Sequence, residues 1–461
     1  MAIIRAYALP HPPLAVPGVG RGQEKGISKT LAAFDEVSQE IAELAPETII
    51  FITPHSVLYA DYFHISPGAS AHGDLVRFGD SGTRFEARYD EKLAEKISSI
   101  AEDAGIPAGG LGERDAKLDH GVTVPMWFIN RRFSDYRVLR ISQSGMTPSE
   151  HYRLGQCITE AADVTGRKTV LIASSDMSHK LKHDGPYGFS SEGPEFDDLV
   201  ARILSAGDFL SLFKIPEALR ERAAECGYNS LMVLAGCFDR QRVDARLLSY
   251  EGPFGVGYAI AAFSPGAHDD SRNFLDQFTD LALAGAREKQ RAEDEYRTLA
   301  RHSLEYTIKS GGSLPLPDSL PDELTRERAG VFVSLHKNGR LRGCIGTIAP
   351  TTGSIANEII QNAISAGLRD TRFEPVTAAE LPYLTYKVDV LLEPEPISSP
   401  QELDVKRYGV IVSSGYKRGL LLPNLDGIDT VEEQVAIARQ KGGISDNAPV
   451  KLERFEVIRH E

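Results

Sequence analysis

The segment TVLIASSDMSH, residues 169–179, points to the fold class of this chain. Its first part, Thr169 to Ala173, is a short apolar run without polar alternation, which is typical of a strand buried on both faces. Helix-like segments such as Lys25 to Leu44 and Glu91 to Ala104 separate it from similar runs. These runs are Ile3 to Ala8, Thr48 to Thr53, Arg137 to Ile141 and Tyr258 to Phe263. The alternation predicts an α/β domain with a mostly parallel sheet covered by helices.

The composition of the chain changes after about residue 264. Ser264 to Asn273 collects Pro, Gly, Ser and charged residues, a composition that predicts a linker. Phe274 to Ser310 follows as a long helical region rich in Ala, Leu, Glu and Arg. A length of 461 residues accommodates two or three domains. We therefore expect an α/β domain at residues 1–268 and a smaller α+β domain at residues 274–461.

The charge and the cysteine content exclude several classes of protein. Lys and Arg number 51 against 65 Asp and Glu, a net charge of -14 with histidine neutral, which argues against a nucleic acid or an anionic membrane as partner. The sequence has neither an apolar run of the ~18 residues that a membrane span needs nor a cleavable signal segment. Its four cysteines are scattered without a CxxC pair, so neither a zinc ribbon nor a disulfide framework is expected. We expect a soluble, cytoplasmic protein that forms a homo-oligomer.

Histidines gather where the predicted strands end. His11, His55 and His179 each follow a predicted strand, His120 precedes an apolar helix-like segment, and His183 lies four residues after His179. In a doubly wound sheet, ligands bind outside the carboxyl ends of the strands. A single histidine at a strand end is usually structural. Several at independent strand ends point instead to metal ligation or proton transfer.

Two imidazoles need a third ligand to hold a divalent ion, and Glu225 is the candidate that stands out. It lies in the segment AAECGYNS, residues 223–230, where small residues leave room around it and Gly227 permits a sharp turn. Two histidines and one carboxylate form the facial ligand set of non-haem Fe(II) oxygenases, and zinc accepts the same set. A charged residue in a surface turn is the alternative interpretation of Glu225.

The histidine-containing segments and the segment around Glu225 resemble, in residue type and in order along the chain, the catalytic subunit of class III extradiol ring-cleavage dioxygenases of the protocatechuate 4,5-dioxygenase type. They also resemble the related Memo family. The resemblance extends from residue 1 to about residue 265. It rests on Pro10-His11-Pro12-Pro13, Pro54-His55-Ser56, Leu118-Asp119-His120-Gly121, Ser174-Ser175-Asp176-Met177-Ser178-His179 and Glu225-Cys226-Gly227. The resemblance implies that His11, His55 and Glu225 bind Fe(II). It also implies that His179 is the acid/base catalyst and that His120 lies beside the substrate and oxygen.

The resemblance implies an Fe(II)-dependent extradiol dioxygenase that cleaves a catechol-type aromatic ring with O2, its substrate being a small aromatic diol. Memo-type relatives carry a cysteine in place of the carboxylate, and Cys226 directly follows Glu225 here. The alternative is therefore a Memo-like metal-binding partner or scaffold in a radical SAM-linked modification system, without oxygenase turnover. A zinc-type hydrolase on the same ligands is a third possibility.

The second domain shows an α+β pattern and resembles the AMMECR family. A hairpin is expected at Asn338-Gly339, and a further strand pair around residues 386–392 and 409–413. The resemblance rests on Leu341-Arg342-Gly343-Cys344-Ile345-Gly346-Thr347, Asp370-Thr371-Arg372-Phe373 and Leu421-Leu422-Pro423. In related systems this domain accompanies a Memo-type protein and a radical SAM protein, which implies a radical SAM protein as partner. Cys344 is predicted to be a buried small side chain, with a reactive thiol and anion binding by Arg342 and Arg372 as alternatives.

Overall fold

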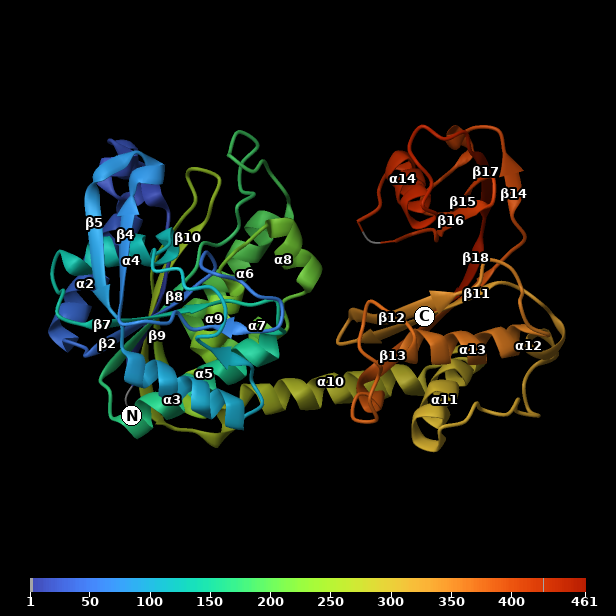
Figure 1. Ribbon diagram of the computed structural model, residues 1–461, viewed down its shortest axis with the longest axis horizontal. Helices are drawn as coiled ribbons and strands as arrows, with labels where there is room; N and C mark the ends of the chain where they lie inside the picture. Colours follow the sequence, from blue (N-terminus) through green and yellow to red (C-terminus); the bar gives the residue numbers. More distant parts are fainter. Residues whose placement is uncertain (1–2, 426) are drawn as a thin grey trace. The chain divides into compact units, whose positions relative to one another are not determined.

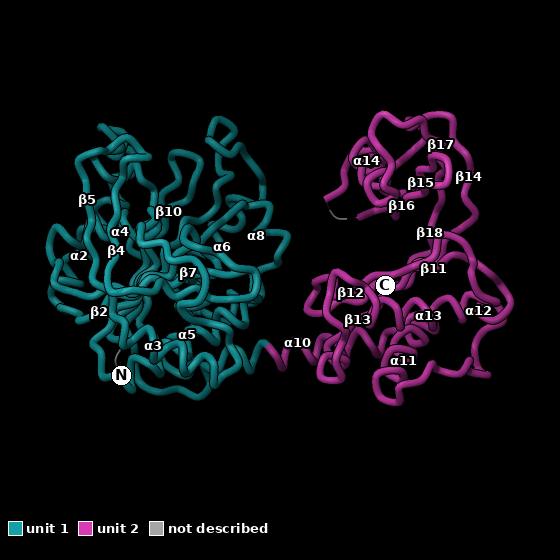
Figure 2. Tube along the Cα trace, in the orientation of Figure 1, with its two compact units in different colours: residues 1–278 teal, residues 279–461 magenta. Residues whose placement is uncertain are grey.

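The computed structural model describes residues 3–425 and 427–461 and divides the chain into two units, residues 1–278 and 279–461 (Figure 2). Each unit has its own sheets and its own hydrophobic core. No helix of the described residues combines the length and the apolar character that a membrane crossing requires.

Unit 1 is built on a six-stranded sheet with the strand order β7-β2-β8-β1-β10-β9 (Figure 1). Its strands are β1 (Ile3–Leu9), β2 (Thr48–Thr53), β7 (Arg137–Ser142), β8 (Thr169–Ser174), β9 (Gln241–Glu251) and β10 (Tyr258–His268). β7, β2, β8 and β1 are parallel, whereas β10 pairs antiparallel with both β1 and β9. Every residue of β2 and β8 is buried, which fits their continuous apolar runs. The predicted α/β class, with a mostly parallel sheet, is confirmed.

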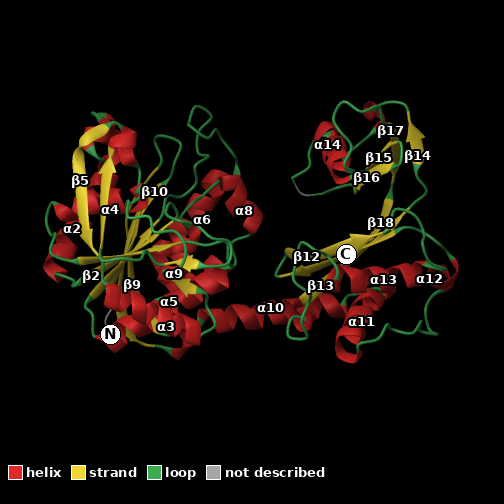
Figure 3. Cartoon of the chain, in the orientation of Figure 1, coloured by secondary structure: helices red, strands yellow, loops and turns green. Residues whose placement is uncertain are grey.

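Helices cover both faces of this sheet (Figure 3). The core on one face includes residues of α3 (Glu91–Asp103), α5 (Pro148–Thr165), α6 (Glu192–Ala206) and α9 (Tyr228–Gly236). The core on the other face includes residues of α2 (Ser28–Leu44) and α4 (His120–Asn130). The other α-helices and strands described in unit 1 are α1 (Pro17–Gly20), β3 (Phe63–His64), β4 (Ser70–Leu75), β5 (Asp80–Arg88), β6 (Ala108–Gly109), α7 (Phe209–Phe213) and α8 (Glu217–Ala223). The boundary between the units falls within α10 (Phe274–Arg291).

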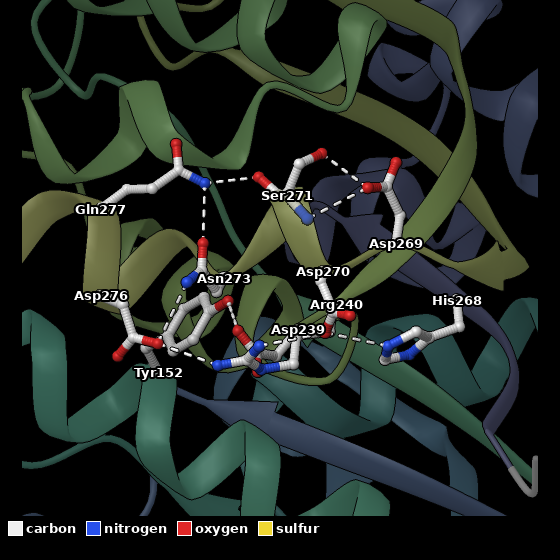
Figure 4. A network of polar contacts seen from close by, with 10 residues as sticks. All are labelled: Tyr152, Asp239, Arg240, His268, Asp269, Asp270, Ser271, Asn273, Asp276 and Gln277. Atoms are coloured by element: carbon white, nitrogen blue, oxygen red, sulfur yellow. Dashed lines mark hydrogen bonds and ion pairs between the residues drawn. The ribbon is translucent and has the colours of Figure 1, made fainter.

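The predicted linker, Ser264 to Asn273, is an ordered part of unit 1. β10 occupies its first half, and a network of polar contacts holds the segment that leads into α10 (Figure 4). In this network Arg240 binds Asp270 at 3.1 Å and Asp276 at 2.9 Å. Phe274 then enters the core of unit 1 with 6% of its surface exposed. The Asp-rich composition reflects carboxylates that pair with an arginine distant in the sequence, a contact that composition does not reveal.

Unit 2 contains two four-stranded sheets, with the orders β12-β11-β13-β18 and β14-β17-β15-β16. Its elements are α11 (Glu295–Ser310), α12 (Asp322–Arg326), β11 (Val331–Lys337), β12 (Arg340–Gly346), α13 (Ile355–Leu368), β13 (Leu384–Leu391), β14 (Glu395–Ile397), β15 (Gly409–Ser414), β16 (Lys417–Leu421), α14 (Val431–Lys441), β17 (Lys451–Phe455) and β18 (Val457–His460). The predicted hairpin is confirmed, because Asn338 and Gly339 join β11 and β12 with positive φ angles of 54° and 81°.

Two details of unit 2 differ from the sequence predictions. The strands at 386–392 and 409–413 exist as β13 and β15, but they do not pair, since they belong to different sheets. The single helical region predicted at 274–310 is two helices, α10 and α11. The side chain of Asp294 accepts a hydrogen bond from the backbone N–H of Arg297 and thereby starts α11 as a new helix.

Candidate metal centre

The predicted site residues lie where three neighbouring parallel strands end. β1, β8 and β2 are adjacent in the sheet and lead into His11, the segment 175–179 and His55, respectively. Because parallel strands end at one edge of a sheet, these segments meet there. His120, the first residue of α4, joins them, with its ring centroid 4.1 Å from that of His55.

The two histidines predicted as metal ligands face each other. Nε2 of His55 lies 3.0 Å from Nε2 of His11, with the ring planes nearly perpendicular. Sγ of Cys226 lies 3.5 Å from the same nitrogen of His11. One donor atom from each of these three residues lies within 4.8 Å of the other two, and among the described residues this is the group that could hold a metal ion.

Hydrogen bonds fix the orientation and the tautomer of His11, which is 1% exposed. The hydroxyl of Ser174 donates to the carbonyl oxygen of Gly121 at 2.6 Å, so its oxygen is left to accept from Nδ1 of His11 at 2.8 Å. Nδ1 therefore carries the proton, and the lone pair of Nε2 points toward His55 and Cys226. The backbone N–H of His11 donates to Asp176 at 2.8 Å. Such outer partners are what a metal-binding imidazole requires.

The imidazoles of the site are neutral. Burial, together with the neighbouring imidazoles, lowers the pKa of His11 well below its usual range. Burial is also the main reason why the pKa of His120 falls to about 3 and that of His179 to about 4, and in both cases His55 adds to the effect. Nε2 of His179 is buried without a hydrogen-bond partner among the described residues, and its ring stacks against Tyr187 at 5.0 Å. A neutral imidazole with a free nitrogen can bind a metal or accept a proton.

In the structure the thiol of Cys226, and not the carboxylate of Glu225, lies beside the two histidines. The carboxylate of Glu225 does not join the two histidines; it accepts a hydrogen bond of 2.6 Å from the backbone N–H of Tyr228, the first residue of α9. A carboxylate is favourable there because the first N–H groups of a helix lack partners within it. Cys226, the next residue in this turn, presents its thiol to His11 instead. Glu225 lies three residues before the first residue of α9, and an acidic residue at this sequence position could have indicated a carboxylate that accepts from the first N–H groups of a helix.

The donor set suits a thiophilic ion. In a tetrahedral zinc site, bond lengths of about 2.0–2.1 Å to nitrogen and about 2.3 Å to sulfur place the donors roughly 3.3–3.6 Å apart. The distance of 3.5 Å from His11 Nε2 to the sulfur of Cys226 lies within this range, and the distance of 3.0 Å to Nε2 of His55 lies slightly below it. Burial and the nearby carboxyl groups of Asp176 and Glu225 raise the pKa of the Cys226 thiol well above its usual value. A bound cation offsets this effect, because thiols deprotonate on metal binding.

Polar groups whose roles the sequence predictions missed lie next to His55 and His120 and form hydrogen bonds and an ion pair there. The carboxylate of Asp119 accepts from the hydroxyl of Thr53 at 2.6 Å and lies 3.6 Å from the guanidinium of Arg140. Arg140 is fully buried, and Asp119 directly precedes His120. The hydroxyl of Thr53 accepts from the backbone N–H of His55. An arginine within a strand gives no sequence signal for such a role.

Other sequence candidates lie outside this cluster. His183 packs against Phe189, with ring centroids 4.6 Å apart. In unit 2 Cys344 is half-buried and accepts a hydrogen bond from the hydroxyl of Ser334 at 3.2 Å, and burial raises the pKa of its thiol. Arg342 binds the carboxylate of Glu380 and Arg372 binds that of Asp370. Both guanidinium groups considered for anion binding thus already have carboxylate partners.

Two solved structures resemble parts of the chain. The uncharacterized protein PH0010 from Pyrococcus horikoshii has 34% sequence identity and a TM-score of 0.33, over 36% of this chain and 88% of its own. The uncharacterized protein JW3007 from Escherichia coli K12 has 14% identity and a TM-score of 0.40, over 56% of this chain and 99% of its own.

Sequence families account for both units. Residues 5–261 match the family described as the catalytic LigB subunit of aromatic ring-opening dioxygenase, and residues 297–460 match the AMMECR1 family. Protein CA_C1420 of Clostridium acetobutylicum is 39% identical over 469 residues, which are 100% of both chains. A protein of Thermotoga maritima is 47% identical over 171 residues, which are 37% of this chain and 98% of its own. The chain therefore belongs to the LigB family through its first unit, and its second unit is similar to the AMMECR1 family.

Proposed function

We propose that unit 1 is a Memo-like metal-binding domain in which His11, His55 and Cys226 hold one thiophilic transition-metal ion. The observation that carries this proposal is the position of the Cys226 sulfur, 3.5 Å from Nε2 of His11, while the Glu225 carboxylate binds the start of α9. Two imidazoles and a thiolate favour zinc or copper(I), whereas the Fe(II) oxygenases use two imidazoles and a carboxylate.

The side chains around this centre position the metal ligands and supply a proton acceptor. A metal ion held here supplies a Lewis acid that polarises an oxygen of a bound ligand. Ser174 fixes the tautomer of His11, and the ring of His120 stacks against that of His55. His179, neutral and with Nε2 unpaired among the described residues, is placed to accept a proton from a ligand bound beside the centre. The AMMECR1 unit supports a place for the whole chain in a modification system that includes a radical SAM protein.

Extradiol cleavage of a catechol-type ring with Fe(II) and O2 is the second candidate function. It is favoured by the family match of unit 1 and by the position of His120, whose ring lies 4.1 Å from that of His55 and 5.4 Å from that of His11. His179 is neutral and its Nε2 has no partner among the described residues, so this nitrogen is free to accept the proton of a phenol hydroxyl group.

Metal content and oxygen consumption separate the two functions. The full chain is purified without added metal and analysed for zinc, copper and iron; a second sample is loaded with Fe(II) under anaerobic conditions and assayed for O2 uptake with a panel of catechols. We expect about one zinc or copper ion per chain, lost in Cys226→Ser and retained in Glu225→Gln, and no catechol-dependent O2 uptake. One iron per chain, lost in Glu225→Gln, with catechol-dependent O2 uptake that His179→Gln abolishes, would instead establish ring cleavage.

A further inference from the structure

The connection between β4 and β5 is attached to the segment that leads into His120. The backbone N–H of His72, in β4, donates to the carbonyl oxygen of Ala116 at 2.9 Å, and the N–H of Leu118 donates to the carbonyl oxygen of His72 at 2.7 Å. His120 follows two residues later as the first residue of α4. The β4–β5 hairpin is therefore held beside the metal centre.

The turn of this hairpin has a defined conformation. Residues Val76–Phe78 form one 3-10 turn, and the carboxylate of Asp74 accepts from the N–H of its first residue at 3.1 Å. Gly79 ends the turn with a φ of 89°, and its carbonyl oxygen accepts from the guanidinium of Arg21 at 2.9 Å. These bonds fix the backbone that carries Arg77.

The guanidinium of Arg77 lies near the histidine rings. Its Cζ atom is 5.2 Å from the centroid of the Phe78 ring, and that ring is 5.3 Å from the ring of His120. His120 stacks in turn on His55. Burial lowers the pKa of both histidines, and the positive charge of Arg77 adds to the effect in each. The guanidinium is thus within electrostatic range of two rings of the centre.

The charge of Arg77 is not used within the described part of the chain. There its side chain forms neither an ion pair nor a hydrogen bond, whereas the neighbouring Arg140 pairs with Asp119. Arg77 and His55 are both exposed, so a ligand in solvent can reach them. The N–H donors of a guanidinium match two oxygen atoms of one acidic group. A positive charge with free donors beside a metal centre favours an anion there.

We propose that Arg77 binds an acidic group, a carboxylate or a phosphate, of the ligand that the metal centre takes up. This assignment rests on the proposed metal-binding function and names the chemical class of its ligand. A ligand held at one end by the metal presents its other end to Arg77 at a high effective concentration, so a contact that is weak by itself contributes to affinity. The cation–π contact with Phe78 limits the positions that the guanidinium can take.

Calorimetric titration of the zinc-loaded full chain with hydroxamates tests the assignment. A hydroxamate binds zinc through its two oxygen atoms, and its tail can end in a carboxylate, a phosphonate or a neutral carboxamide. Tails of about two to six methylene groups cover the separations that the contact with Arg77 allows. At the best tail length an acidic hydroxamate should bind about tenfold more tightly than the carboxamide, in keeping with one charge-assisted hydrogen bond. The order of carboxylate and phosphonate then shows which acid is preferred.

Three variants separate recognition from structure and from general charge attraction. Arg77→Gln should bring the acidic and neutral hydroxamates to within about twofold of each other, while zinc content and binding of the carboxamide stay unchanged. Arg77→Lys keeps a point charge without the planar fork and should retain part of the preference. Arg84→Gln removes the same charge from an exposed position of β5 and should leave the preference within about twofold of the wild type.

The outcomes distinguish this assignment from the metal-binding function. A preference for acidic tails that survives in Arg77→Gln, or that falls equally in Arg84→Gln, would overturn the role of Arg77 and leave the metal centre in place. The same holds if the wild type binds acidic and neutral hydroxamates alike. A chain that binds neither zinc nor the carboxamide hydroxamate would refute the metal centre, and the assignment of Arg77 with it.

Discussion

Replacement of Ser174 by alanine tests how the metal centre is held. Ser174 is fully buried, accepts from Nδ1 of His11 at 2.8 Å and donates to the carbonyl oxygen of Gly121 at 2.6 Å. Alanine leaves both groups unsatisfied, and each buried unsatisfied group costs about 1–3 kcal/mol, so the free energy of unfolding should fall by about 2–6 kcal/mol. It also frees the tautomer of a metal ligand, a change that typically weakens metal binding about 10- to 100-fold.

The assay compares two buried serines. Ser178 is also fully buried, and its hydroxyl donates to the carbonyl oxygen of Ala223 at 2.9 Å, but it does not contact His11, His55 or Cys226. Zinc affinity is measured on the metal-free full chain by competition with a chromogenic chelator, and stability by urea unfolding. Both alanine variants should lose stability, and only Ser174→Ala should lose zinc affinity. Unchanged zinc affinity in Ser174→Ala would refute the role given to this hydroxyl.

Three further predictions concern the domain boundary, a buried carboxyl group and the base. Residues 1–278 expressed alone should fold and bind zinc. Residues 1–268 should be less stable by at least about 2 kcal/mol in urea unfolding, because this fragment lacks the buried side chain of Phe274. Equal stability of the two fragments would place the domain boundary at the earlier position. Burial raises the pKa of Asp197 to about 7, so the stability that this group contributes is full below about pH 4 and is lost as the pH rises through 7. Asp197→Asn should therefore flatten the pH dependence of the unfolding free energy between these pH values. An unaltered slope would contradict this prediction. His179→Gln should leave zinc affinity unchanged and lower any metal-dependent turnover about 10²- to 10⁴-fold; loss of the metal would make His179 a ligand.

The sequence was most informative where structure depends on local patterns. Continuous apolar runs such as Thr48 to Thr53 and Thr169 to Ser174 are fully buried strands, because helices cover both sides of a parallel sheet. The convergence of His11 and His55 also followed from their place after such strands, since parallel strands end at a common edge. Asn338 and Gly339 gave the hairpin because its turn requires two positive φ angles.

The sequence was least informative where two neighbouring residues could play the same part or where contacts are distant in sequence. Glu225 and Cys226 occupy one turn, and residue type alone did not show that the carboxylate binds the start of α9 while the thiol meets the histidines. Arg140, buried beside Asp119, and Arg240, paired with Asp270, depend on long-range contacts that no local pattern records. Side-chain direction within a turn and pairing across the fold are therefore what only the structure supplied.

X-ray absorption spectroscopy at the zinc edge tests the central claim most directly, because it reports the elements bound to the ion. The zinc-loaded full chain should show imidazole nitrogen and one sulfur at about 2.3 Å, the usual Zn–S distance. Cys226→Ser should remove the sulfur, and Glu225→Gln should leave the spectrum unchanged. A spectrum with nitrogen and oxygen alone, unaltered in Cys226→Ser and altered in Glu225→Gln, would contradict the assignment of Cys226 as the third ligand.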